Sequence, residues 1–201
     1  MPTKYHLIRN KEGKITGLET NQTGHDLLDN PRLNKCGAFT QEERETFELI
    51  GKLPQQIETI EEQVEKTYAH YQTQGDDLTK NLYLNALHDR NETLFYCLVG
   101  QHIKEMLPII YTPTIGDAVE KFSLNMQRPR GLYLSYPDMH RMDDMLANRA
   151  NEDVDIMVVS DGEGVLGIGD QGVGGINICI GKLMCYVLCA GLNPLRKLPI
   201  I

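Results

Sequence analysis

The stretch that most constrains the fold of this chain runs from residue 155 to 191. It begins with Ile156–Val159, a short apolar run typical of a buried strand, and Val165–Ile168 predicts a second strand soon after it. A glycine-rich loop follows, and then an apolar helix that we expect to end at Gly191, with Pro194 just beyond it. The stretch therefore predicts a strand, a loop and a helix that belong to an α/β layer.

The residues on either side of this stretch continue the alternation of strands and helices. Leu132–Tyr136 predicts a strand, Met139–Leu146 predicts a helix, and another apolar run begins at Leu198. Alternation of this kind is typical of a parallel sheet covered by helices. Because the chain stops inside the last run, we expect this α/β part to be truncated.

The N-terminal half is predicted to be mainly helical. Residues 1 to 39 are polar and suggest an extended arm with one short strand at Tyr5–Ile8. Thr40 and Glu43 fit a capping box, and Pro54 suits the first turn of the next helix. The apolar stripe of that helix recurs at three- and four-residue spacing, at Ile57, Ile60, Val64, Tyr68 and Tyr71.

The segment that joins the two halves is predicted to be extended at Met106–Tyr111 and helical from Thr114 to about Met126. The predicted fold class is thus α/β, with a mainly helical N-terminal domain over residues 1–129. The start of a parallel α/β domain, carrying the substrate and catalytic residues, follows over residues 130–201.

Composition excludes several classes of function. The formal net charge is −8, and no basic run is present, which argues against nucleic acid or an anionic membrane as a partner. The N-terminus has no apolar signal core, and no uninterrupted run of about 20 apolar residues predicts a membrane span. The five cysteines show no CxxC spacing and suggest free thiols in a reducing, cytoplasmic compartment.

The glycine-rich loop matches the dinucleotide fingerprint G-x-G-x-x-G from Gly167 to Gly172. Two features weaken that interpretation. The ribose-binding acid expected about 20 residues further on is missing, and Asp170 puts a negative charge where a pyrophosphate needs neutral amides. We therefore prefer a tight strand-to-helix turn in which the backbones approach closely.

Lys182 is the only charged residue between Asp170 and Arg196. A lone cation in an apolar helix either extends its ammonium group to water or has a functional role. Burial would favour the neutral amine, which is a competent general base. The pattern alone leaves both interpretations open.

Tyr111 is the second candidate. Its phenol follows an apolar segment and precedes a proline-stiffened helix start, which would suit a fixed proton donor. Most tyrosines in such positions are core residues that hydrogen bond through the hydroxyl, so this pattern is weak by itself.

Several long motifs resemble the malic enzyme family. They cover nearly the whole chain from about residue 30 and comprise NKCGAFTQEER (34 to 44), RNETLFYCLV (90 to 99), LPIIYTPTIGDA (107 to 118), RPRGLYLSY (128 to 136) and VVSDGEGVLGIGDQGVGGINICIGKL (158 to 183). The resemblance implies an enzyme that oxidises malate and decarboxylates the product to pyruvate and carbon dioxide. It also implies NAD or NADP as cofactor, together with Mg²⁺ or Mn²⁺.

The resemblance assigns roles to four residues. Tyr111 matches the tyrosine of the family's YTPT motif, which acts as general acid, and Lys182 matches the lysine of the GKL motif, which acts as base. Leu166 falls in the substrate-side segment. Gly164 stands where the family usually has an arginine that binds a substrate carboxylate, and this departure is similar to malolactic enzymes.

The resemblance also implies what this chain lacks. The family's acidic metal ligands and its NAD-binding domain lie C-terminal to these residues, so we expect the chain by itself to be inactive. A homodimer or homotetramer acting on a small dicarboxylate is expected. The alternatives are a malolactic enzyme, which converts malate to lactate, and a stand-alone helical dimerisation or interaction module.

Overall fold

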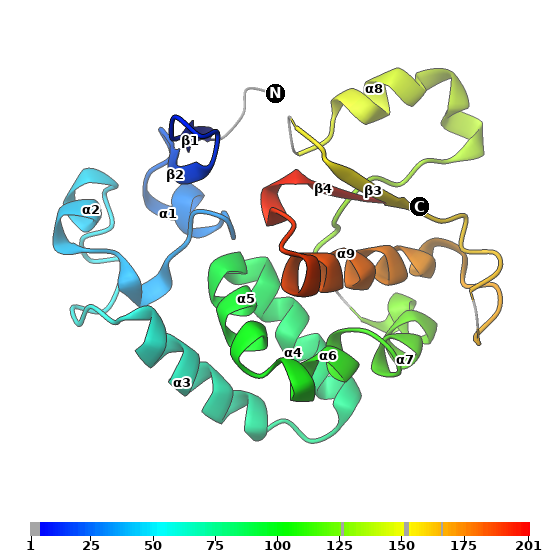
Figure 1. Ribbon diagram of the computed structural model, residues 1–201, viewed down its shortest axis with the longest axis horizontal. Coiled ribbons are helices and arrows are strands. Elements are labelled where there is room, and N and C mark those ends of the chain that lie inside the picture. The colour runs from blue at the N-terminus through cyan, green and yellow to red at the C-terminus, as the bar shows by residue number, and fades with distance from the viewer. Residues whose placement is uncertain (1–4, 126, 151–152, 166) are drawn as a thin grey trace. The chain divides into compact units, whose positions relative to one another are not determined.

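The computed structural model describes residues 5–125, 127–150, 153–165 and 167–201 (Figure 1). The chain divides into two compact units. The first combines Met1–Thr73 with Ala86–Leu98, and the second combines Gln74–Asn85 with Val99–Ile201. Each unit is thus formed by two separate ranges of the chain, which alternate along the sequence. The predicted domain boundary between residues 129 and 130 stays a prediction.

The first unit begins with an antiparallel hairpin of β1 (His6–Arg9) and β2 (Ile15–Glu19). The side chain of Asn10 accepts hydrogen bonds from two amides of the turn, Glu12 N at 3.1 Å and Lys14 N at 2.9 Å. The predicted strand at Tyr5–Ile8 is therefore confirmed as β1. Its partner β2 was not predicted, since its alternation is weak.

Three helices of the first unit follow the hairpin: α1 (Gly24–Leu28), α2 (Gln41–Thr46) and α3 (Ile60–Gln72). The predicted capping box of Thr40 and Glu43 is confirmed at the start of α2. The predicted helix start at Pro54 is wrong, because a second capping box, formed by Thr59 and Glu62, begins α3 six residues later.

The loop before α3 is held by one buried arginine. Arg44 is 4% exposed, and its guanidinium donates to the carbonyl oxygens of Phe39, Gly37, Pro54, Gln55 and Gln56. These hydrogen bonds hold the segment around Pro54 in a non-helical conformation. An apolar cluster of Leu27, Leu33, Phe39 and Leu49 lies in the same unit and forms its core.

Two helices, α4 (Asp77–Arg90) and α5 (Glu92–Gln101), contribute residues to both units. The second unit continues with α6 (Ile103–Ile110), α7 (Thr114–Glu120) and α8 (Met142–Ala147). It ends with β3 (Ile156–Val159), α9 (Ile176–Ala190) and β4 (Lys197–Ile200). Short 3₁₀ helices lie at Cys36–Ala38, Phe122–Leu124, Tyr136–Arg141, Gly172–Gly175 and Pro194–Arg196.

The predicted parallel α/β arrangement is present as a β3–α9–β4 unit. The two strands pair in parallel, with Ile156 opposite Lys197, and α9 packs against both of them (Figure 1). Gly191 ends α9 as predicted, with a left-handed φ of 69°. The predicted strand at Leu132–Tyr136 is reduced to one bridge, in which Leu132 pairs in parallel with Ile200.

Two predicted elements are wrong. The segment Met106–Tyr111 is not extended, because residues 106–110 belong to α6, which carries Pro108 inside it and buries Met106, Ile109 and Ile110 on one face. Burial of that helical face outweighs the local cost of the proline. Of the predicted strand Val165–Ile168, Leu166 lies outside the described residues, and the amides of Ile168 and Gly169 donate to Val165 O in a turn instead of pairing with a strand.

One helical segment of the described residues, Gly172–Ala190, is long and apolar enough to cross a membrane by length and composition alone. Within the second unit its helix α9 contacts β3, β4, α6 and α7. These contacts are those of a core helix.

We predict that the second capping box is a measurable part of the stability of the first unit. Replacing Thr59 with alanine leaves the amide of Glu62 without its side-chain acceptor. The free energy of unfolding should fall by about 1 kcal/mol in urea denaturation. Thr59→Ser keeps the hydroxyl and serves as the control, so an equal loss in both variants would contradict this account.

Candidate active site

Tyr111 lies where the end of α6 meets the middle of α9. The phenol ring packs on Gly181, at which an added Cβ would lie 2.9 Å from Tyr111 Cδ2 and 3.1 Å from the carbonyl oxygen of Ile110. Any larger residue would push the end of α6 away from α9. Gly181 is therefore the residue that permits this close approach.

Lys182 directly follows Gly181 in the sequence and lies in the middle of the same helix α9. Its side chain is exposed, as expected for a lysine that extends its ammonium group to water. The reason is the helix geometry, since Gly181 and Leu183 face inward while the residue between them faces away from the core. The ammonium group is open to a ligand.

The surroundings of Tyr111 favour its neutral phenol. Partial burial raises the pKa of Tyr111, and the nearby Cys185, Tyr186 and Cys179 act in the same direction. The side chain therefore keeps its proton at neutral pH. A neutral phenol can act as a proton donor.

Tyr111 is also fixed by the chain around it. Its amide donates to Leu107 O at 3.1 Å and its carbonyl oxygen accepts from Ile115 N at 2.8 Å, so it joins α6 to α7. The Thr112–Pro113 peptide between these helices is cis. The side chains of Ile115, Ala118 and Val119 form the apolar cluster against which Tyr111 packs.

The glycine-rich loop before α9 folds closely on itself. Gly162 has a left-handed φ of 73°, and an added Cβ there would lie 2.2 Å from the carbonyl oxygen of Gly172. Gln171 N donates to Gly162 O at 2.8 Å, and the Asp170 carboxylate accepts from Gly172 N at 2.9 Å. The Gly172 amide, which a pyrophosphate would need as a donor, is therefore already bonded to a carboxylate of the loop itself. This favours the interpretation of the loop as a close turn over its interpretation as a nucleotide-binding loop.

The two predicted substrate-side residues have different outcomes. Gly164 is exposed, and an added Cβ would meet nothing within 4 Å. Its φ is outside the left-handed region, so the position accepts a side chain. Leu166 lies outside the described residues.

Metal and cofactor positions were predicted to lie outside this chain. Within residues 5–125, 127–150, 153–165 and 167–201, no three His, Cys, Asp or Glu side chains come together as a metal-binding group. The donor set for a divalent metal is therefore not complete in the described part of the chain. We assign no residue of it to NAD.

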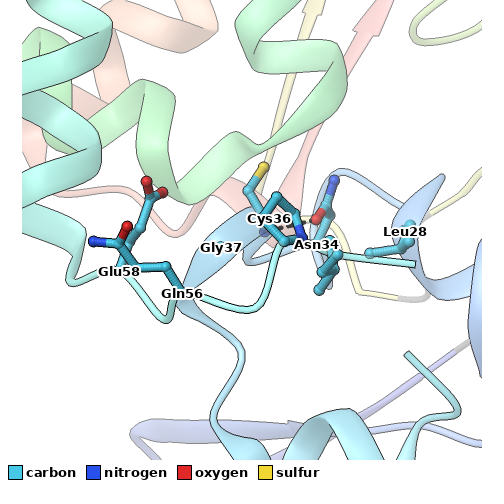
Figure 2. Close-up of a pocket in the computed structure, with 8 residues that line it drawn as sticks. Leu28, Asn34, Cys36, Gly37, Gln56 and Glu58 are labelled. Atoms are coloured by element: carbon cyan, nitrogen blue, oxygen red, sulfur yellow. Dashed lines mark hydrogen bonds between the residues drawn. The ribbon is translucent and has the colours of Figure 1, made fainter. Parts of the chain in front are cut away.

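A separate cavity of about 310 Å³ lies in the first unit (Figure 2). It is lined by Leu28, Asn34, Cys36, Gly37, Leu53, Pro54, Gln56 and Glu58. In Figure 2 the amide of Cys36 is joined to the Asn34 side chain, a hydrogen bond of 2.7 Å. Because Tyr111, Gly164 and Lys182 all belong to the second unit, this cavity is not the candidate active site.

Sequence reasoning did not identify Gly181 as a functional position. The available signal was a glycine inside an apolar helix, a residue that usually marks a close backbone or side-chain approach. Which residue would approach it could not be read from the sequence. The partner, Tyr111, lies on another helix.

Comparison with known proteins identifies the family of this chain. Residues 88–201 match the family model described as malic enzyme, N-terminal domain, and this range contains Tyr111, Gly164 and Lys182. The chain belongs to the malic enzyme family.

Individual relatives are similar over most of the chain. It is 53% identical to the NAD-dependent malic enzyme of Aeromonas hydrophila and 54% identical to that of Aeromonas salmonicida, each over 178 residues. It is also 53% identical to NAD-dependent malic enzyme 2 of Photobacterium profundum. These matches cover 89% of this chain and 32% of each relative, so the chain spans about a third of their length.

We predict that a single methyl group at residue 181 disturbs the Tyr111 contact. The free energy of unfolding of Gly181→Ala should be lower than that of Gly100→Ala by about 1–3 kcal/mol in urea denaturation. The reason is that the methyl group added at residue 181 meets close neighbours, whereas the one added at residue 100 does not. Gly100 is a matched control in helix α5, where an added Cβ meets nothing within 4 Å. Equal stability of the two variants would show that α6 and α9 do not need this close approach.

Proposed function

We propose that this chain is the N-terminal catalytic portion of an NAD-dependent malic enzyme. In this proposal the complete protein oxidises (S)-malate with NAD as hydride acceptor and decarboxylates the product to pyruvate and carbon dioxide. The observation that carries the proposal is the packing of Tyr111 on Gly181, directly beside Lys182, in a chain of the malic enzyme family.

Lys182 is proposed to be the base. Oxidation of a secondary alcohol requires loss of the hydroxyl proton as the C2 hydride departs, and an amine within reach of that hydroxyl can accept the proton. The exposed position of Lys182 on α9 leaves its amine accessible to a substrate. We propose that residues elsewhere in the complete protein close the site over it.

Tyr111 is proposed to be the acid. Loss of carbon dioxide from the oxidised substrate leaves an enolate, which becomes pyruvate when a proton is added at C3. A phenol that keeps its proton at neutral pH can donate it there, and burial raises the pKa of Tyr111 in the required direction. The bonds to α6 and α7 hold the donor in place.

The remaining parts of the proposal concern the complete protein. The names of the relatives support NAD as cofactor, while NADP is the alternative. A divalent metal, Mg²⁺ or Mn²⁺, is proposed to bind residues outside the described ones. We also propose a cytoplasmic homodimer or homotetramer.

We predict that Lys182→Ala in the complete protein lowers kcat for malate oxidation by about 10²–10⁴-fold, the usual contribution of a general base. Because the side chain is exposed, thermal stability should stay unchanged. Lys121→Ala removes another exposed lysine of the same unit and serves as the control. Near-normal turnover of Lys182→Ala would return this residue to the role of a solvated surface cation.

A malolactic reaction is the second candidate, because Gly164 stands where an arginine that binds carboxylate is usual in the family. The two functions differ in their products. The malic reaction yields pyruvate and NADH in equal amounts, whereas lactate without net NADH would overturn the malic proposal. Quantifying both products from the complete protein decides between them.

We predict that Gly164→Arg tightens malate binding. The position is open and its backbone accepts a side chain, so the variant should fold with a stability change of less than about 0.5 kcal/mol. A guanidinium that reaches the substrate carboxylate should lower KM by about tenfold or more. Gly75→Arg, at another open position, is the control, and an equal effect there would show a nonspecific charge effect.

A further inference from the structure

Two cysteines lie one helical turn apart in the second half of α9 (Figure 1). Cys185 is half-buried, Cys189 is exposed, and both are free thiols. Residues four apart on a helix are neighbours on its surface, with Cβ atoms about 5–6 Å apart. The helix therefore presents two sulfur atoms that one ligand can reach together.

The surroundings of Cys185 agree with this spacing. Burial raises the pKa of Cys185, and the neighbouring Cys189 raises it further. The Cys185 thiol therefore keeps its proton at neutral pH. A ligand that reacts with protonated thiols suits this pair better than one that requires two thiolates side by side.

A direct disulfide between the two residues is disfavoured by the helix. The Cβ atoms of a disulfide lie about 3.5–4.5 Å apart, which is closer than helical neighbours come. Forming it would distort the last turn of α9, which is closed by a hydrogen bond from the Gly191 amide to Tyr186 O. A single atom bonded to both sulfur atoms spans the wider gap without moving the backbone.

A divalent metal ion is also a poor match for the pair. Zn²⁺ sites in proteins have three or four protein ligands, and their cysteines bind as thiolates. Within the part of the chain that the structure describes, no three His, Cys, Asp or Glu side chains come together to complete such a site. A trivalent arsenical with one organic substituent needs only two sulfur ligands, and it takes them from protonated thiols.

We propose that Cys185 and Cys189 form a dithiol site that binds one trivalent arsenical of this kind. Both sulfur atoms bond to arsenic, and the oxygen of the arsenical leaves as water with the two thiol protons. Neither arsenic nor sulfur is oxidised or reduced, so the reaction needs no further reagent. The site is independent of the proposed malic reaction.

The dithiol lies close to the proposed acid. Gly181, on which the ring of Tyr111 packs, is one turn before Cys185 on the same helix. Burial is the main cause of the raised pKa of Tyr111, and Cys185 is near enough to add to it. An arsenical bound at Cys185 would therefore lie beside the side chain to which we assign the protonation step.

Protection of Cys189 from alkylation tests the proposal in the reduced complete protein. Iodoacetamide labels the exposed thiol, and the tryptic peptide of residues 183–196 contains Cys185 and Cys189 and no other cysteine. A small excess of phenylarsine oxide, the probe, should slow the alkylation of Cys189 by at least about tenfold. An unchanged rate would overturn the proposal.

Three variants show whether the protection needs two thiols at this spacing. Cys185→Ser removes the partner thiol and should abolish the protection of Cys189. Adding Val187→Cys to Cys185→Ser places a thiol at a half-buried position two residues from Cys189, on a different side of the helix, and should not restore the protection. Cys97→Ser, at a half-buried cysteine of α5, is the control and should keep it.

Two outcomes of the variants would contradict the dithiol site. Protection that persists in Cys185→Ser, or returns with Val187→Cys, would show that the spacing on α9 is not what binds the probe. Loss of protection in Cys97→Ser would show that the effect is not specific to this helix. Because alkylation is measured on a peptide, the result does not depend on whether the complete protein oxidises malate, which is assayed separately.

Discussion

The structure of the second unit depends on how closely α6 approaches α9. At Gly181 the α9 surface carries no side chain, and the carbonyl of Ile110 and the ring of Tyr111 come within van der Waals distance of its backbone. The same helix packs against β3 and β4 on another side, so it connects the sheet with α6 and α7. A substituent at this point would separate the proposed acid from the helix that carries the proposed base.

This arrangement explains why an apolar helix carries a charged residue. Within α9, the residues on both sides of Lys182 are buried, while Lys182 itself faces outward. Its charge therefore costs little, because the ammonium group remains solvated. The contact at Gly181 sets the position of the Tyr111 ring relative to the backbone of α9.

The first unit is organised by a different device. The guanidinium of Arg44 donates to five main-chain carbonyl oxygens, those of Gly37, Phe39 and residues 54–56. An apolar cluster that includes Phe39 and Leu49 lies in the same unit. A buried arginine with all its partners in the main chain can fix an irregular segment as firmly as regular structure does.

Sequence alone determined the elements whose signals are local. The capping box at Thr40, the helix end at Gly191 and the strands β3 and β4 follow from short patterns that depend on neighbouring residues. The motifs around Tyr111 and Lys182 were also sufficient to indicate the family. Tertiary structure decided the rest, because α6 forms across Pro108 to bury one face, and Lys182 is exposed by its angle on α9. Both outcomes depend on contacts between segments far apart in the chain, whose energies no local pattern contains.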